Sequence, residues 1–200
     1  MNKYQIRGKT NIMMKNILLT TFLLSGALQA QSSVGIDINT EDVEVFANYN
    51  LNSDIGYTGG TSILVDTSYL YSSESESNLF SIGISGESSL EAQQGLTFGF
   101  GTKFVFAEDF MALPLLGRVT FMLPFDSDIP TTSLTGMFAY APSVLTFSDG
   151  ESYLEYRLEA DMEVISNIHI FTGYRNIDTN YEFFDYTLND SFYAGLKVGF

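Results

Sequence analysis

Cysteine is absent from this 200-residue chain, and histidine occurs once, at position 169. Without cysteine the chain has no disulfide, no thiolate metal site and no lipidated cysteine of the lipoprotein type. Enzyme chemistry needs an acid, a base or a nucleophile held together in one cleft. Ser166 and Asp161 lie near His169 in the sequence, but a catalytic triad requires geometry that sequence proximity does not supply. A membrane enzyme therefore ranks third among the functions considered, and no catalytic residue is assigned.

Basic residues are scarce: nine lysines and arginines stand against 24 aspartates and glutamates, which gives a net charge of −15 at pH 7. Four of the nine basic residues precede residue 31 and none of the acidic ones does, so residues 31–200 carry five basic and 24 acidic residues, or −19. A field of this sign repels nucleic acid, which is excluded as a partner.

Long apolar runs are also missing. The run Ile17–Leu24 is far shorter than the roughly 20 residues that cross a bilayer as a helix. Basic residues precede it and the small-residue segment Ser25–Ala30 follows it, an order that predicts a cleaved signal peptide at residues 1–30. Because the basic segment is long, Met13 or Met14 is an alternative start. Membrane residence of residues 31–200 would then depend on strands.

Apolar and polar residues alternate with period two through residues 31–200, and no segment keeps a helical period. The alternation predicts eight strands, near residues 62–72, 78–86, 95–106, 115–124, 134–142, 153–165, 167–177 and 191–200. The same pattern predicts a further hairpin from residues 34–38 and 43–51.

The fold predicted from these strands is all-β: one antiparallel transmembrane β-barrel of eight to ten strands over residues 31–200. Ten is preferred, since bacterial barrels usually have an even number of strands. Ten strands would make the connection 52–61 periplasmic and long, and the turn 40–42 external and short. Outer-membrane barrels usually have short periplasmic turns and longer external loops, so this reverses the usual arrangement. The external loops expected from this topology are residues 72–78, 107–114, 143–152 and 178–190.

The segment Ser191–Phe200 favours a membrane because Phe192, Leu196 and Val198 share one apolar face. In water such a terminal strand is prone to aggregation, whereas in lipid the apolar face is required and barrel closure removes the free edge. The segment also resembles the C-terminal assembly signal of bacterial outer-membrane barrels, which makes the barrel-assembly machinery an expected partner. The residues that carry this resemblance are Tyr193, Gly195, Val198 and Phe200.

Charged residues share the opposite face from the apolar ones in the predicted strands. In a membrane barrel that face lines the lumen, because ionised groups on the lipid face cost several kcal/mol near the midplane. A barrel of eight to ten strands has little interior room, so these charges are expected to form a plug of ion pairs. The predicted lumen network comprises Asp66, Lys103, Arg118, Glu155, Arg157, Glu159, Asp161, Glu163, Arg175 and Lys197.

Two groups of carboxylates, within residues 37–44 and 74–76, offer the oxygen ligands that divalent cations prefer. Neither has the spacing of a calcium loop, and solvated acidic turns are the more common occurrence. No metal site and no other cofactor is predicted.

Several segments resemble the YfaZ family of outer-membrane proteins, and the resemblance extends over roughly residues 31–200. The segments are Gly95–Phe110, Ala112–Leu115, Tyr140–Ser143, Ser152–Asp161 and Gly173–Asp178. The resemblance implies an outer-membrane barrel of a Gram-negative bacterium and transfers no catalytic or ligand-binding residue.

The function expected from these observations is that of a non-enzymatic, integral outer-membrane barrel with a mostly closed lumen and acidic external loops. Outer-membrane lipid and lipopolysaccharide are its expected surroundings. The alternative is a narrow channel or porin for ions or small polar solutes.

Overall fold

The computed structural model describes residues 32–56, 60–73, 76–90, 95–125, 130–181 and 185–200. The predicted signal peptide, residues 1–30, lies outside the described residues. Within the described ranges, no helix is both long enough and apolar enough to cross a bilayer.

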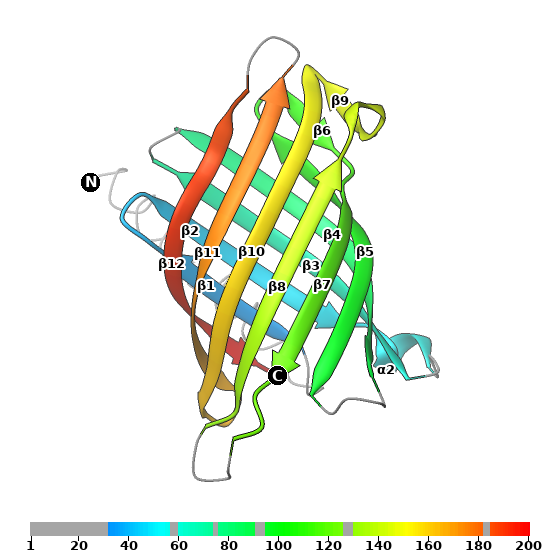
Figure 1. Cartoon of the computed structure of the whole chain (residues 1–200), viewed down its shortest axis with the longest axis vertical. Helices are drawn as coiled ribbons and strands as arrows, with labels where there is room; N and C mark the ends of the chain where they lie inside the picture. The colour runs from blue at the N-terminus through cyan, green and yellow to red at the C-terminus, as the bar shows by residue number, and fades with distance from the viewer. Residues whose placement is uncertain (1–31, 57–59, 74–75, 91–94, 126–129, 182–184) are drawn as a thin grey trace, which may run out of the picture. The chain divides into compact units, whose positions relative to one another are not determined.

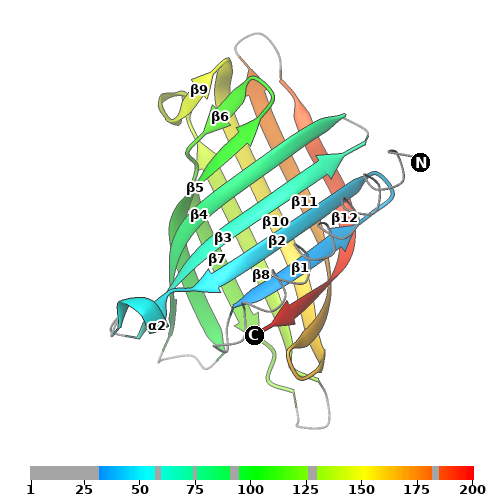
Figure 2. The same ribbon diagram turned by 180° about the vertical axis from the view of Figure 1, so that it is seen from behind.

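Ten antiparallel strands of the described chain form one closed barrel (Figures 1 and 2). The pairing of β1 with β12, from Ser33 opposite Gly199 to Ile38 opposite Ala194, closes the sheet. The preferred strand number and the predicted N-terminal hairpin are therefore confirmed. The barrel strands are β1 (Ser33–Ile38), β2 (Asp42–Asn50), β3 (Thr61–Ser72), β4 (Ser77–Ser89), β5 (Leu96–Ala107), β7 (Leu115–Met122), β8 (Thr132–Ala141), β10 (Gly150–Ile165), β11 (Ile168–Tyr181) and β12 (Thr187–Gly199).

Four short elements occur in the connections, and the sequence pattern did not predict them. They are α2 (Asn52–Ile55), β6 (Phe110–Ala112), the 3-10 turn η1 (Ser143–Leu145) and β9 (Thr146–Ser148). β6 pairs with both β5 and β9, so the regions expected as plain loops at 107–114 and 143–152 are in fact joined by a small extension of the sheet. Part of the region expected as a loop at 178–190 belongs to strands, since β11 continues to Tyr181 and β12 begins at Thr187.

The turn between β1 and β2 is short because Asn39 organises it locally. Its side-chain Oδ1 accepts hydrogen bonds from the backbone N–H groups of Glu41 and Asp42, both at 2.7 Å. This is the turn chemistry for which asparagine is favoured. The connection after β2 is longer and contains α2, so the predicted contrast between the two connections is present.

The two ends of the barrel differ in the connections that they contain. The upper end, as drawn in Figure 1, holds β6, β9 and the adjoining ends of β11 and β12, and the lower end holds the tight β10–β11 turn. Asn167 has a positive φ of 65° in that turn, a conformation that asparagine tolerates better than most residues.

The barrel exposes its apolar side chains and encloses its charged ones. Each of the ten barrel strands contributes large apolar residues to the exterior, with Ile36 45%, Phe100 72% and Phe192 76% exposed. Arg175, Glu44 and Glu155 are in contrast 0% exposed. A water-soluble protein has the opposite distribution, so the exterior is built to contact hydrocarbon.

An apolar cluster fills the upper end of the barrel interior. It contains Leu70, Leu79, Val105, Phe110, Ala112, Leu116, Ala139, Ala141, Tyr153, Ile177 and Leu188. The ring of Phe110 in β6 packs against Tyr153 and Tyr181, with ring centroids 6.2 and 5.4 Å apart. Because β6 is hydrogen-bonded to β5 and to β9, it holds Phe110 in place at the upper end.

Gly195 makes room for an aromatic ring inside the barrel. A Cβ added there would lie 2.3 Å from Cζ of Phe171 and 2.4 Å from the backbone oxygen of Ile36. The backbone oxygen belongs to the β1–β12 closure and cannot move without disturbing it. A glycine is therefore required at this position for packing.

We expect Gly195→Ala to lower the free energy of unfolding by about 1–3 kcal/mol, the usual cost of overpacking. Gly199→Ala, in the same strand, is the matched control, since its Cβ would approach no atom closer than 3.7 Å. The control should change stability by less than about 0.5 kcal/mol. Urea titration of the barrel in detergent micelles measures both, and equal stabilities of the two variants would contradict the packing argument.

Candidate functional site

A chain of ion pairs crosses the barrel interior directly below the apolar cluster. Lys103 of β5 contacts Glu155 of β10, and Arg157 Nε donates to Glu155 Oε1 at 2.6 Å. Arg157 Nη2 also donates to Glu44 Oε1 of β2 at 2.9 Å. Arg175 of β11 contacts the same Glu44. The four strands β2, β5, β10 and β11 are thereby joined through side chains.

Two carboxylates are the centres of this chain, and each has several donors. Glu155 accepts from Lys103, from Arg157 and from the Tyr153 hydroxyl, the last at 2.6 Å. Glu44 accepts from both Arg157 and Arg175. A buried carboxylate pays a large desolvation penalty, which paired cations with good geometry offset.

Arg175 extends the chain to the wall formed by β1 and β12. Its Nη1 lies 3.3 Å from Asp37 Oδ1, and its Nε donates to Asn189 Oδ1 at 3.0 Å. The guanidinium also lies over the ring of Tyr193, 5.1 Å from the centroid, in a cation–π contact.

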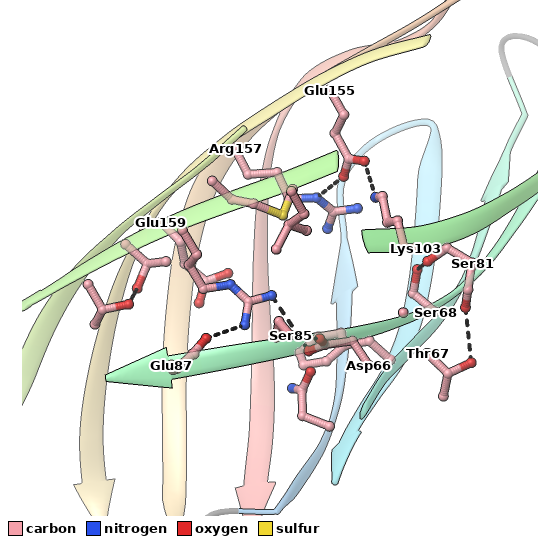
Figure 3. Close-up of a pocket in the computed structure, with 18 of the residues that line it drawn as sticks. Asp66, Thr67, Ser68, Ser81, Ser85, Glu87, Lys103, Glu155, Arg157 and Glu159 are labelled. Atoms are coloured by element: carbon pink, nitrogen blue, oxygen red, sulfur yellow. Dashed lines mark hydrogen bonds and ion pairs between the residues drawn. The ribbon is translucent and has the colours of Figure 1, made fainter. Parts of the chain in front are cut away.

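A polar cavity of about 320 Å³ extends from the ion-pair chain toward the lower end of the barrel. Glu155, Arg157 and Glu159 project toward it from β10, while Asp66 of β3 and Glu87 of β4 lie across from them (Figure 3). Serine and threonine side chains supply much of the remaining wall: Thr67, Ser68, Ser81, Ser85, Thr102, Thr120, Ser133 and Thr135.

Two smaller ion clusters line the interior below the chain. Arg118 of β7 donates to Glu87 Oε1 at 2.8 Å and lies 3.5 Å from Asp66 Oδ1. Lys197 of β12 lies 2.9 Å from Asp161 Oδ2 and 3.5 Å from Glu159 Oε1. In each cluster one cation bridges two carboxylates.

Solvent access differs between the chain and the lower clusters. The side chains of Glu44, Glu155 and Arg175 are 0% exposed, whereas those of Asp66 and Glu159 are 24% exposed. Water therefore reaches the lower clusters and the Arg157 side chain, which is 20% exposed, whereas Glu44 and Glu155 are shielded from it.

The structure brings nine of the ten residues of the expected lumen network into ion pairs: Asp66, Lys103, Arg118, Glu155, Arg157, Glu159, Asp161, Arg175 and Lys197. Glu163 is placed elsewhere. Its Oε1 accepts from the backbone N–H of Asn167 at 2.9 Å and so stabilises the β10–β11 turn.

Sequence reasoning omitted Glu44, Asp37 and Glu87 from the network. Glu44 and Asp37 belong to the carboxylate group at 37–44 that the sequence predicts to be a solvated acidic turn, but the alternation in 43–51 places Glu44 opposite its apolar neighbours. That alternation is the signal in the sequence that could have placed Glu44 in the lumen.

His169 lies at the lower end of the interior, where its Nδ1 is 2.8 Å from Asp161 Oδ1. Asp161 also pairs with Lys197, so the carboxylate balances a cation in addition to contacting the imidazole. Within the described residues, no group of three or more histidines and carboxylates is arranged to hold a metal ion.

The residues of the expected assembly signal lie on different faces of β12. Tyr193 is 3% exposed and its hydroxyl donates to Glu159 Oε2 at 3.2 Å inside the barrel. Val198 is 46% exposed on the outer face, and Phe200 follows the last residue of the strand. Gly195 faces inward beside Phe171.

We expect Glu155→Gln to lower the free energy of unfolding by about 3–5 kcal/mol, because Lys103 and Arg157 would lose a buried counter-charge. Glu151→Gln is the matched control in the same strand, since Glu151 is exposed, and it should change stability by less than about 0.5 kcal/mol. Urea unfolding in micelles is the measurement. A loss below 1 kcal/mol for Glu155→Gln would show that the chain contributes little to stability.

Comparison with solved structures gives similar chains of low sequence identity, two of which are described here. A "Bacterial polysaccharide outer membrane secretin" is 6% identical with a TM-score of 0.47, and the match covers 80% of this chain and 56% of that one. A "KdgM porin in complex with disordered oligogalacturonate" is 10% identical with a TM-score of 0.48, and the match covers 84% of this chain and 99% of that one. This chain thus spans little more than half the length of the first. Comparison with curated proteins gives no sequence match.

The sequence model of one family, described as "YfaZ precursor", matches residues 121–200. This range includes three of the segments that suggested the resemblance and excludes those before residue 121. The match confirms the expected resemblance to this family over residues 121–200, the C-terminal part of the barrel.

Proposed function

We propose that this protein is an integral outer-membrane barrel of a Gram-negative bacterium with a closed lumen and a non-enzymatic role in the envelope. The observation that carries the proposal is the order of layers inside the barrel. An apolar cluster closes the upper end, and a buried chain of ion pairs lies directly beneath it.

The two layers oppose permeation for different reasons. The apolar cluster offers a permeating ion no polar partner, so entry would require the ion to lose its hydration shell. The ion-pair chain lies in the section below, and displacing one of its cations would take a counter-charge away from a buried carboxylate. A solute would have to disrupt both layers in series.

The membrane placement rests on the apolar exterior and on the closure of the sheet. A closed barrel satisfies every backbone group of a membrane-spanning strand without water. The upper end then faces the medium, and its exposed carboxylates include Glu76, Glu108, Asp109, Asp149 and Glu151. The lower end, with the C-terminus of β12, faces the periplasm. Membrane lipid and lipopolysaccharide are the proposed surroundings, and the assembly machinery is the proposed partner during biogenesis.

A narrow channel is the second candidate, because the polar cavity of about 320 Å³ already occupies the lower interior. It would conduct only if the apolar cluster and the ion-pair chain both moved. An enzyme is not favoured, because His169 is paired with Asp161 at the lower end and the upper rim presents no histidine among the described residues.

We expect the intact barrel to show no steady conductance in planar lipid bilayers. Measurement after reconstitution of the processed chain, with insertion verified by heat-modifiable migration on a denaturing gel, tests this expectation. Reproducible single-channel steps large enough for solutes would overturn the closed-lumen proposal in favour of the channel.

The two layers should have to be weakened together before the lumen conducts. We expect Arg157→Ala alone and Phe110→Ala alone to remain silent, because each leaves the other layer in place. The combination of Arg157→Ala with Phe110→Ala should give conductance steps. If Arg157→Ala alone conducts, the apolar cluster is not a seal.

A further inference from the structure

A groove lies on the outer surface of the barrel across strands β5, β7, β8 and β10. It has a volume of about 520 Å³, and outward-facing apolar residues form its walls. Arg118 and Arg157 also border it, but their charged groups are engaged in the ion pairs inside the barrel. The surface that the groove presents to a ligand is therefore almost entirely hydrocarbon.

Two glycines form the floor of the groove, and strand register explains its shape. Gly117 is paired with Phe100 on one side and Phe138 on the other. Gly136 is paired in the same way between Val119 and Leu158. Each glycine leaves a gap in a row of outward side chains.

The walls of the groove project well beyond its floor. Phe100 is 72% exposed, Leu158 62% and Phe138 53%. A Cβ added at Gly117 would meet no atom within 4 Å, so the space above that residue is open. At Gly136 the nearest atom is Cδ2 of Leu158, at 3.6 Å.

The width of the groove matches one hydrocarbon chain. Adjacent strands lie about 4.8 Å apart, so walls separated by one glycine strand lie about 9.6 Å apart. A row of methylene carbons needs about 4 Å to each wall for optimal contact. One chain fits between the walls, and two do not.

We propose that this groove is a binding site for one acyl chain of a phospholipid. The proposal rests on the membrane placement proposed above, because the groove is continuous with the apolar exterior. A chain in the groove contacts protein on three sides, whereas a chain on a convex part of the barrel contacts it on one. Since burial from water gains nothing within a membrane, these additional dispersion contacts provide the preference for the groove.

Native mass spectrometry tests the proposal. The full barrel is purified in detergent micelles with phosphatidylethanolamine added, and the lipid that stays bound after release from the micelles is counted. The variant carries Gly117→Leu and Gly136→Leu, which fill the groove without a backbone clash. The matched control is Ala194→Leu, an apolar enlargement at an exposed outward position of β12. We expect the wild type and the control to retain one phospholipid about five-fold more often than the double variant.

Equal retention by a folded wild type and a folded double variant would overturn the groove proposal while leaving the membrane placement intact. A wild-type dimer that the double variant loses would also overturn it, because a second copy would then be the occupant. A processed chain that stays folded and monomeric in detergent-free buffer would overturn the membrane placement, and the acyl-chain site with it.

Discussion

The hydrogen-bonded pairing of β1 with β12 is the interaction on which the rest of this structure depends. It removes the two free edges of a ten-stranded sheet and so allows the backbone to be satisfied without water. Closure also divides the side chains into two sets, since alternate residues must point to the interior or the exterior. The apolar set faces outward on every strand, and the charged set is confined to a narrow lumen.

Confinement explains why the ion pairs form connected clusters. A charge in the lumen cannot withdraw to bulk water, so a cation that bridges two carboxylates is more favourable than an isolated pair. Arg157, Arg175, Arg118 and Lys197 each bridge two carboxylates. Because each cluster joins side chains of at least two strands, the clusters also fix the relative positions of the walls. In the proposed function the ionic chain seals the lumen, and its pairs also connect the strands that carry them.

Most of the strands could be predicted from alternation alone. A period of two over eight or more residues, with one apolar face, indicates a β-strand and few other structures. The inward orientation of Lys103, Arg118, Arg157, Arg175 and Lys197 followed from the same parity. The short strands β6 and β9 did not follow, since three residues are too few for a periodic signal. Their pairing depends on contacts between segments more than 30 residues apart.

The sequence by itself determined the strand positions, the two faces of each strand and the membrane-type exterior, because these are local consequences of residue order. Only the tertiary structure decided which charges meet. Glu44 pairs with Arg157 although 113 residues separate them, and the register around the whole barrel sets that contact. The position of the apolar cluster and the groove at Gly117 and Gly136 were decided in the same way. Each arises from neighbouring strands whose alignment no single segment encodes.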